Sequence, residues 1–277
     1  MSYRFVVSVC LPLIRLFTAT LFIFLSSTHG SALADWKEFN SAPVQSTDSA
    51  KIRGFMSKPE GPGPFPAVII AHGCFGVEQN QFEWAKRLNA WGYATVIVDS
   101  FSTREVSDVC SDPDAVSPEI RACDVFGAAA FLRMQTFVNP QRVGLIGFSH
   151  GGWTALYVAQ EELPAQAQQE PLQAVVAYYP WCPSFGLKET KTPLLVLAGK
   201  KDDWTPLDRC ERLLDNQKNE FKKQVKLIAY DNAHHGFDDA NFETPKVFDG
   251  HVISFESTAA TKSIDDAKAY LARFLNP

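Results

Sequence analysis

The sequence predicts an α/β fold in which helices cover both faces of a mainly parallel sheet. Short apolar runs of strand length alternate along the chain with longer stretches of helical character, and this alternation is typical of strands joined by right-handed helical crossovers. Most of the apolar runs are continuous, as expected for strands covered on both faces. The composition, 46% hydrophobic and 21% charged, is that of a globular protein and excludes a collagen, a coiled coil or a disordered chain.

Six apolar runs are predicted to be strands, and the first follows a Gly/Pro-rich turn at residues 61–66. The predicted strands cover residues 67–71, 94–99, 142–147, 174–179, 194–199 and 225–230. The predicted helices cover residues 81–91, 118–137, 152–162, 206–221 and 258–274. In such a sheet, ligands bind beyond the carboxyl ends of the strands, so residues that follow these runs are candidates for a site.

Residues 1–34 have the composition of a secretory signal. They contain no Asp or Glu, Arg4 and Arg15 precede an apolar run over residues 16–25, and Ala32-Leu33-Ala34 supplies an A-x-A cleavage site. The run is shorter than the roughly 20 apolar residues of a spanning helix; an uncleaved anchor beginning at Phe5 is the alternative. We expect a cleaved signal, an exported protein that is periplasmic or secreted, and one domain over residues 35–277.

The net charge and the absence of zinc-binding motifs limit the ligands and partners that the chain is expected to bind. The net charge of −5 offers no basic surface for nucleic acid. Neither a C-x-x-C pair nor H-E-x-x-H occurs, so a zinc site is not indicated. We expect no metal, no organic cofactor, no nucleic acid and, after signal cleavage, no stable membrane association. Five cysteines follow the signal, and this odd number leaves at least one thiol free or paired elsewhere.

The strongest chemical signal is Gly147-Phe148-Ser149-His150-Gly151, a G-x-S-x-G motif. It lies between a predicted strand and a predicted helix, the context in which this motif exposes a nucleophilic serine on a tight turn. The flanking glycines relieve crowding across the turn, and the following helix N-terminus supplies partial positive charge where an oxyanion would form. A Gly-rich turn without chemistry is the alternative. A dinucleotide-binding loop is disfavoured because the glycines do not follow G-x-G-x-x-G.

A nucleophilic serine needs a base and an orienting carboxylate, which this architecture supplies in the order Ser, acid, His. The candidate acids, Asp202 and Asp203, follow the strand predicted at 194–199. The candidate bases, His234 and His235, follow the strand predicted at 225–230. The orienting carboxylate is expected to be buried and its neighbour solvated or capping the next helix. The residues alone do not say which member of each pair is which.

In six segments the chain resembles the dienelactone hydrolase family of α/β-hydrolases, over about residues 52–275. The segments are HGCFG (72–76), GYATVIVDSF (92–101), GFSHGG (147–152), YYPWC (178–182), GKKDDWTP (199–206) and AHHGFD (233–238). The resemblance implies the α/β-hydrolase fold and a Ser-His-Asp triad. In the family's G-x-x-D-x-x-x-P pattern, Gly199 and Pro206 select Asp202 as the acid. In its H-G-F pattern the catalytic histidine directly precedes Gly-Phe, which selects His235.

The resemblance also implies an oxyanion hole of two backbone N–H groups, those of Cys74 and His150. The name-giving dienelactone hydrolases use a cysteine nucleophile assisted by a glutamate in the loop before the oxyanion residue. Here Ser149 and Gly73 stand at those positions. The chain is therefore similar to the serine-nucleophile members, and general ester chemistry is expected rather than dienelactone hydrolysis.

One disulfide is favoured in this fold, with two buried free thiols as the alternative, and a second is a candidate. Cys182 and Cys210 would lie near the carboxyl ends of neighbouring strands, and a bond between them is favoured. Cys110 and Cys123 flank a Ser/Asp/Pro-rich segment and are a second candidate pair.

The expected substrate is a small ester or lactone, because no long lid insertion is evident and the longest candidate, residues 100–118, is polar. Aromatic residues flank the motif loops and are expected either to line an apolar pocket or to pack in the core. They are Phe75, Phe82, Trp153, Trp181, Trp204 and Phe237. The alternatives are a peptidase of the prolyl-peptidase-like type and a non-catalytic binding protein on a hydrolase scaffold.

Overall fold

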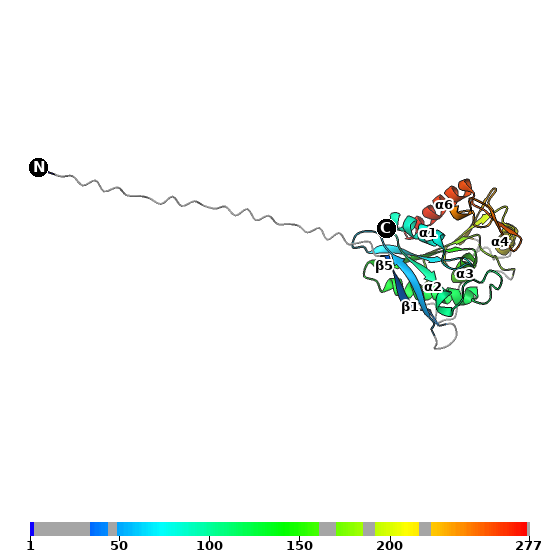
Figure 1. Cartoon of the computed structure of the whole chain (residues 1–277), viewed down its shortest axis with the longest axis horizontal. Coiled ribbons are helices and arrows are strands. Elements are labelled where there is room, and N and C mark those ends of the chain that lie inside the picture. Colours follow the sequence, from blue (N-terminus) through cyan, green and yellow to red (C-terminus); the bar gives the residue numbers. More distant parts are fainter. Residues whose placement is uncertain (3–33, 44–48, 161–169, 185–191, 216–222, 276–277) are drawn as a thin grey trace.

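The computed structural model describes residues 1–2, 34–43, 49–160, 170–184, 192–215 and 223–275, and it confirms the predicted α/β class. Its centre is an eight-stranded sheet in the order β1-β2-β4-β3-β5-β6-β7-β8 (Figure 1). The strands are β1 (Ala34–Asn40), β2 (Lys51–Ser57), β3 (Phe65–Ala71), β4 (Ala94–Asp99), β5 (Val138–Phe148), β6 (Ala174–Tyr178), β7 (Leu194–Gly199) and β8 (Val225–Tyr230). All six predicted strands belong to this sheet, and from β4 to β8 every neighbouring pair is parallel.

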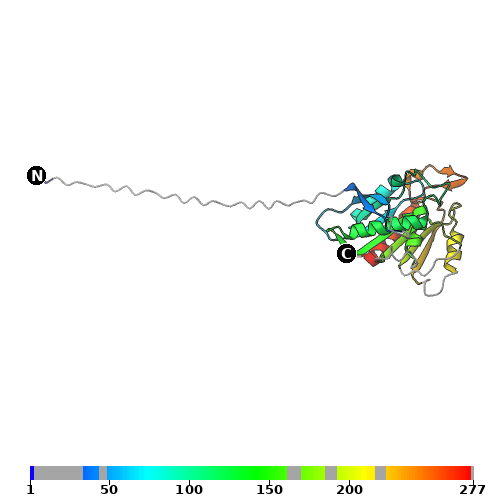
Figure 2. The same cartoon turned by 90° about the horizontal axis from the view of Figure 1, so that it is seen from below.

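The sequence analysis missed β1 and β2, which add an antiparallel edge to the sheet. Strand β1 is mostly exposed, and β2 alternates exposed and buried side chains over its first half, so neither contains the continuous apolar run that identified the other strands. A short hairpin of β9 (Lys246–Phe248) and β10 (His251–Ile253) was also missed. Figure 2 shows this hairpin, in orange, projecting at the same end of the molecule as the helix α4 (Leu207–Asp215).

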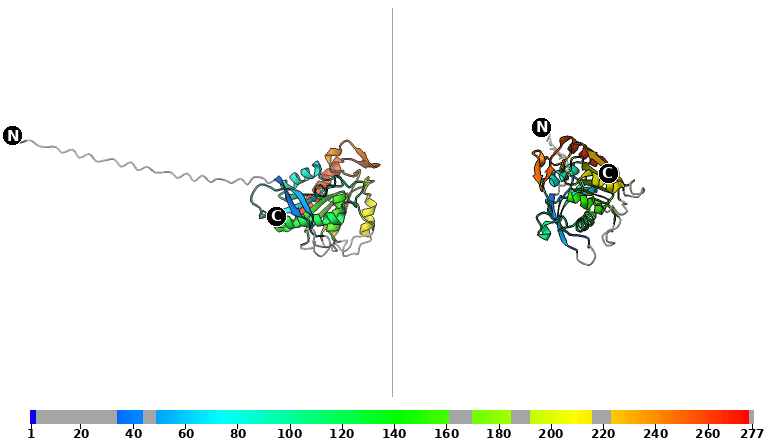
Figure 3. Two further views of the ribbon diagram at one scale, coloured as in Figure 1. Left: turned by 60° about the horizontal axis from the view of Figure 1, so that its bottom comes forward. Right: turned by 90° about the vertical axis from the view of Figure 1, so that its right-hand side faces the viewer.

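Helices cover both faces of the sheet, as predicted. Besides α4 they are α1 (Gln79–Ala90), α2 (Pro118–Arg133), α3 (His150–Val158) and α6 (Ser257–Leu275). The apolar residues of α2, α3 and α4 pack on one face and those of α1 and α6 on the other (Figure 3). Strand β3 shows the division, because Ile69 contributes to one core and its neighbours Val68 and Ile70 to the other.

The helix boundaries differ from the prediction by a few residues. Helix α2 ends at Arg133 rather than at residue 137, because the chain turns there and enters β5 at Val138. The predicted helix ends at residues 162 and 221 lie outside the described residues.

The predicted secretory signal falls almost entirely on residues 3–33, which lie outside the described part of the chain. Within the described part, no helix combines the length and the apolar character needed to cross a membrane.

Candidate active site

Ser149 occupies the turn between the end of β5 and the start of α3, as the motif predicts. Its backbone has φ 53° and ψ −114°, a conformation rare for a residue with a side chain. A Cβ at Gly147 would lie 2.1 Å from the carbonyl oxygen of Gly151, and one at Gly151 would lie 2.3 Å from that of Ala71. The two glycines of the motif are therefore required by close backbone contacts, and the turn they allow presents Ser149 at the carboxyl edge of the sheet.

The structure brings Ser149 together with a histidine and a carboxylate from two other loops. Nε2 of His235 lies 2.9 Å from Oγ of Ser149, and Nδ1 of His235 lies 2.9 Å from Oδ2 of Asp202. With the Nδ1 proton directed at the carboxylate, Nε2 is free to accept the serine hydroxyl proton. Asp202 follows β7 and His235 follows β8, so three strand ends meet at this point.

The neighbouring acid is differently placed. Asp202 is buried and accepts hydrogen bonds from the backbone N–H groups of Trp204 and Thr205 and from Oγ1 of Thr205. Burial alone would raise the pKa of this carboxyl, but the charge of His235 and the hydrogen bonds outweigh burial and lower it. The Asp203 side chain is half exposed and lies 3.6 Å from His251. Of the two adjacent acids, Asp202 is thus the one in contact with His235.

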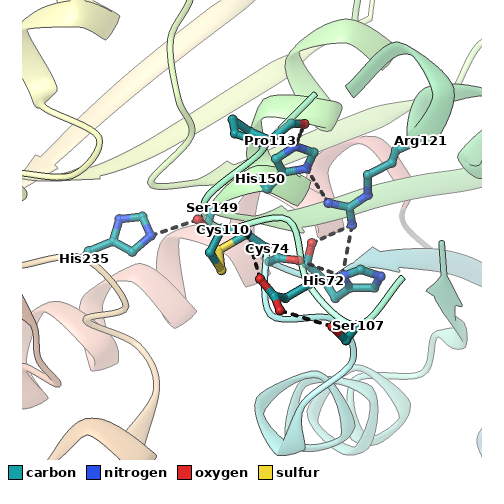
Figure 4. The surroundings of a disulfide bond; sticks show 11 residues. His72, Cys74, Ser107, Cys110, Pro113, Arg121, Ser149, His150 and His235 are labelled. Carbon is teal, nitrogen blue, oxygen red and sulfur yellow. Dashed lines mark hydrogen bonds between the residues drawn. A yellow bond between two sulfur atoms is a disulfide. The ribbon is translucent and has the colours of Figure 1, made fainter. Parts of the chain in front are cut away.

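The loop after β3 reaches the serine from the other side. A Cβ at Gly73 would lie 3.7 Å from Cβ of Ser149, and Gly73, Cys74 and Ser149 line the same hollow. Cys74 is disulfide-bonded to Cys110 (Figure 4). A side-chain thiol at position 74 is therefore not available for chemistry, and only the backbone of this residue is left to act.

One of the two candidate cysteine pairs is bonded in the structure. Cys182 and Cys210 are bonded, as favoured. The Cys110–Cys123 pairing is wrong, because Cys110 pairs with Cys74. The thiol of Cys123, on α2, is free and buried, and burial raises its pKa to about 11.

A buried polar network missed by the sequence analysis lies beneath the serine loop. The guanidinium of Arg121, on α2, donates to Nδ1 of His150 (2.6 Å) and to the backbone oxygen of His72 (2.6 Å). Nε2 of His150 donates to the backbone oxygen of Pro113 (2.9 Å). Burial, together with the charge of Arg121, lowers the pKa of His150 to about 3, so this imidazole is neutral. The charged residues Arg121 and Asp124, which lie among small and apolar residues in the helix sequence, were the signal that could have revealed buried polar contacts.

Two hollows of unequal size flank Ser149. The smaller has a volume of about 40 Å³ and the larger about 630 Å³. The smaller is lined by Gly73, Cys74, Phe75, Glu78, Asn80, Gln81, Phe148, Ser149, Tyr179, Trp204, His235, Gly236, Asp239, Phe242 and Ile253. The larger is lined by Cys74, Val109, Cys110, Pro113, Asp114, Ser149, His150, Trp153, Trp181, Asp203, Trp204, Thr205, Pro206, Arg209 and His251.

The aromatic residues singled out in the sequence divide between these hollows and the core. Trp153, Trp181 and Trp204 line the larger hollow, and Phe75 lines the smaller. Two others pack in the core instead. Phe237 is fully buried, and Phe82 packs edge-to-face on Phe55. In the described residues, no group of three or more His, Cys, Asp or Glu side chains is arranged to hold a metal ion.

The sequence of the chain matches a known protein family. The profile described as the dienelactone hydrolase family matches residues 52–275. An uncharacterized protein of Mycobacterium tuberculosis is 26% identical over 187 residues, which cover 62% of this chain and 64% of that protein; the chain thus spans slightly less than two thirds of this relative.

Two solved structures share the fold. A dienelactone hydrolase from Anabaena variabilis superposes with a TM-score of 0.58 at 22% identity, over 87% of this chain and 99% of that one. An esterase from Thermogutta terrifontis, solved with propionate bound, superposes with a TM-score of 0.60 at 17% identity, over 87% and 94% of the two chains. At these identities the likeness extends to the fold alone.

Proposed function

The chain belongs to the dienelactone hydrolase family, and from this premise we propose that it is a serine hydrolase that cleaves a carboxylic ester or a lactone through an acyl-enzyme. The observation that carries the proposal is the pair of 2.9 Å contacts that link Ser149 to His235 and His235 to Asp202. A nucleophile, a base and an orienting acid in this sequence of contacts are what acyl transfer requires.

The reaction follows from these positions. Nε2 of His235 takes the hydroxyl proton as Oγ of Ser149 attacks the carbonyl carbon, and Asp202 stabilises the imidazolium. The oxyanion accepts hydrogen bonds from the backbone N–H groups of Cys74 and His150, each worth about 3–4 kcal/mol in comparable sites. His235 then gives its proton to the departing alkoxide. Water, activated by the same nitrogen, attacks the acyl-enzyme and releases the acid.

The unequal hollows support a substrate with one compact and one bulky side. A volume of about 40 Å³ beside Ser149 suits a substituent of a few atoms. The larger hollow is lined by Trp153, Trp181 and Trp204, and the guanidinium of Arg209 stacks 3.7 Å from the ring centre of Trp181. Such a surface favours an aromatic ring. We therefore propose an ester or lactone that carries an aromatic group on one side of the scissile carbonyl only.

Three esters of similar intrinsic reactivity test this proposal: benzyl acetate, methyl phenylacetate and benzyl phenylacetate. At least one of the first two is expected to show a kcat/KM ten or more times that of the third, in which both sides are aromatic. Ser149→Ala is expected to hydrolyse none of them while keeping the native circular dichroism spectrum. Hydrolysis by Ser149→Ala at the native rate contradicts the serine mechanism. Equal rates on all three esters contradict the one-sided aromatic site, and faster cleavage of peptide amides than of esters favours a peptidase.

We further propose that the chain is exported and that residues 35–277 form one domain. The two disulfides, Cys74–Cys110 and Cys182–Cys210, are consistent with an oxidising compartment. Mass spectrometry of the protein isolated from its native cells tests signal cleavage, which is expected after Ala34, and an intact Met1 would contradict cleavage.

A further inference from the structure

We propose that residues 109–113, the clasp segment, position both backbone donors of the oxyanion hole, and that Cys110 and Arg121 are positioning residues of the hydrolytic reaction. The inference rests on the proposed function, because the two donors are those assigned above to Cys74 and His150. It adds a role for a disulfide and a buried cation that the triad does not use. Figure 4 shows these groups gathered on one side of Ser149, opposite His235.

The first donor residue is fixed by the clasp segment in two ways. The Cys74–Cys110 disulfide joins the side chains, with the Cα atoms 4.9 Å apart. The backbone N–H of Val109 donates to the carbonyl oxygen of Cys74 at 2.9 Å. Val109 is itself buried, in a small apolar cluster that includes Cys74 and Phe101. The side chain and the following peptide of Cys74 are therefore both held, which limits rotation of its N–H group.

The second donor residue, His150, is held by Pro113 at the other end of the clasp segment. The imidazole of His150 is held between the carbonyl oxygen of Pro113 and the guanidinium of Arg121. His150 begins α3, so its ring anchors the first turn of the helix, which carries the backbone N–H assigned to the oxyanion hole. The imidazole thus acts as an anchor for the backbone rather than as a proton carrier.

Arg121 connects the two anchored loops. It is fully buried, and its two terminal nitrogens reach the chain at His72, two residues before Cys74, and the ring of His150. The ring of His72 also holds the loop that carries Cys74. Its Nδ1 donates to the carbonyl oxygen of Gly73 at 2.7 Å, and its Nε2 accepts from the backbone N–H of Ser100. A shift of about 1 Å in groups that position a reacting centre can lower a rate about 100-fold.

The second disulfide provides a matched control. Cys182 and Cys210 join α4 to the loop after β6, and both residues are 1% exposed. Neither residue carries an assigned donor or lines either hollow. Cys110 is partly exposed. A soluble reductant is therefore expected to reach Cys74–Cys110 first.

The experiment compares the double variants Cys74→Ala/Cys110→Ala and Cys182→Ala/Cys210→Ala with the native enzyme. The first keeps the backbone N–H at position 74 but loses the tether. Its kcat is expected to fall 10- to 100-fold with KM within about threefold. Its affinity for an alkyl boronic acid, which forms a tetrahedral adduct on serine, is expected to fall by a similar factor to kcat/KM. The control variant is expected to lose thermal stability and keep kcat within twofold.

Reduction of the folded protein gives a second test that does not depend on refolding. In the Cys182→Ala/Cys210→Ala background, a water-soluble trialkylphosphine transfers two electrons to the remaining disulfide. This yields two thiols and the phosphine oxide, whose oxygen comes from water. The expected result is the same loss of kcat, restored when oxidised glutathione re-forms the disulfide.

A kcat within twofold of native after loss of Cys74–Cys110, by either route, overturns the inference. So does an equal loss of kcat in both double variants, because the effect would then be general to disulfides. Failure of the proposed function is distinguished by Ser149→Ala: if that variant hydrolyses the ester at the native rate, the serine mechanism itself is wrong, whatever the disulfide variants do.

Discussion

The two sides of Ser149 are held in different ways. On the side of proton transfer, His235 and Asp202 are proposed to act through their side chains, and short hydrogen bonds from nearby residues such as Thr205 fix them. On the oxyanion side, the backbone is proposed to act, and the side chains of Cys74 and His150 serve as anchors through a disulfide and a buried cation. The contrast indicates that a side chain adjacent to a catalytic serine can contribute by holding its own backbone.

The largest expected effect is on the proton-transfer side. Asp202→Asn is expected to lower kcat by about 10³- to 10⁴-fold, because an amide cannot stabilise the imidazolium and favours the wrong tautomer of His235. Asp203→Asn, the matched neighbour, is expected to lower kcat less than tenfold, since its carboxylate is half exposed and faces His251. Steady-state hydrolysis of benzyl acetate measures both. A larger loss at Asp203 would reverse the assignment of the acid.

The next effect lies on the oxyanion side. Arg121→Gln is expected to lower kcat 10- to 100-fold and the free energy of unfolding by about 3 kcal/mol, because it removes a buried charge and leaves the carbonyl oxygen of His72 without its donor. Arg133→Gln is the control on the same helix, where the guanidinium bonds the backbone oxygen of Pro140. It is expected to keep kcat within twofold. If Arg121→Gln and Arg133→Gln have the same kcat, Arg121 is not a positioning residue.

A smaller effect is expected from the hydrogen bonds around the acid. Thr205→Val removes the hydroxyl that donates to Oδ2 of Asp202 at 2.8 Å and keeps the backbone N–H that also reaches this carboxylate. One such bond to a charged group is worth about 1.5 kcal/mol, so kcat is expected to fall about tenfold. Thr261→Val, which removes an exposed hydroxyl on α6, is the control. An unchanged kcat at Thr205→Val would show that the remaining bonds suffice.

The smallest effect concerns pH and stability. The folded-state pKa of His150 is lowered to about 3, whereas an unfolded histidine titrates near pH 6.5. Between about pH 6.5 and pH 3 the unfolded chain therefore binds the additional proton. The stability from this ring is fully present above about pH 6.5 and is lost as the pH falls, by up to about 1.4 kcal/mol per pH unit. For His150→Gln, the free energy of unfolding, measured with urea, is expected to fall less steeply between pH 6.5 and pH 5 than it does for the native protein. Equal slopes for the two proteins would contradict a neutral buried ring.

The sequence was sufficient to predict which strand ends would meet, because the G-x-S-x-G turn, the Asp202/Asp203 pair and the His234/His235 pair each follow a predicted strand. The six central strands were predictable, since each is a continuous apolar run. The edge strands β1 and β2 were not, because their mostly exposed or alternating pattern is weak. The choice between Asp202 and Asp203 came from family resemblance, not from the local residues.

The Cys74–Cys110 bond and the Arg121 network could not be predicted because they depend on tertiary contacts. Cys110 is 36 residues from Cys74 along the chain, whereas Cys123 is much nearer to it in sequence. Spacing alone therefore favoured the wrong partner. The same holds for Arg121, whose partners His72 and His150 come from two different loops.

The most direct test of the central claim is covalent labelling of the native enzyme with a fluorophosphonate, followed by peptide mass spectrometry. The account predicts one adduct per chain, located on Ser149, with loss of ester hydrolysis in proportion to labelling. An enzyme that continues to hydrolyse benzyl acetate at its full rate with Ser149 labelled, or that loses activity through an adduct on another residue, would contradict it.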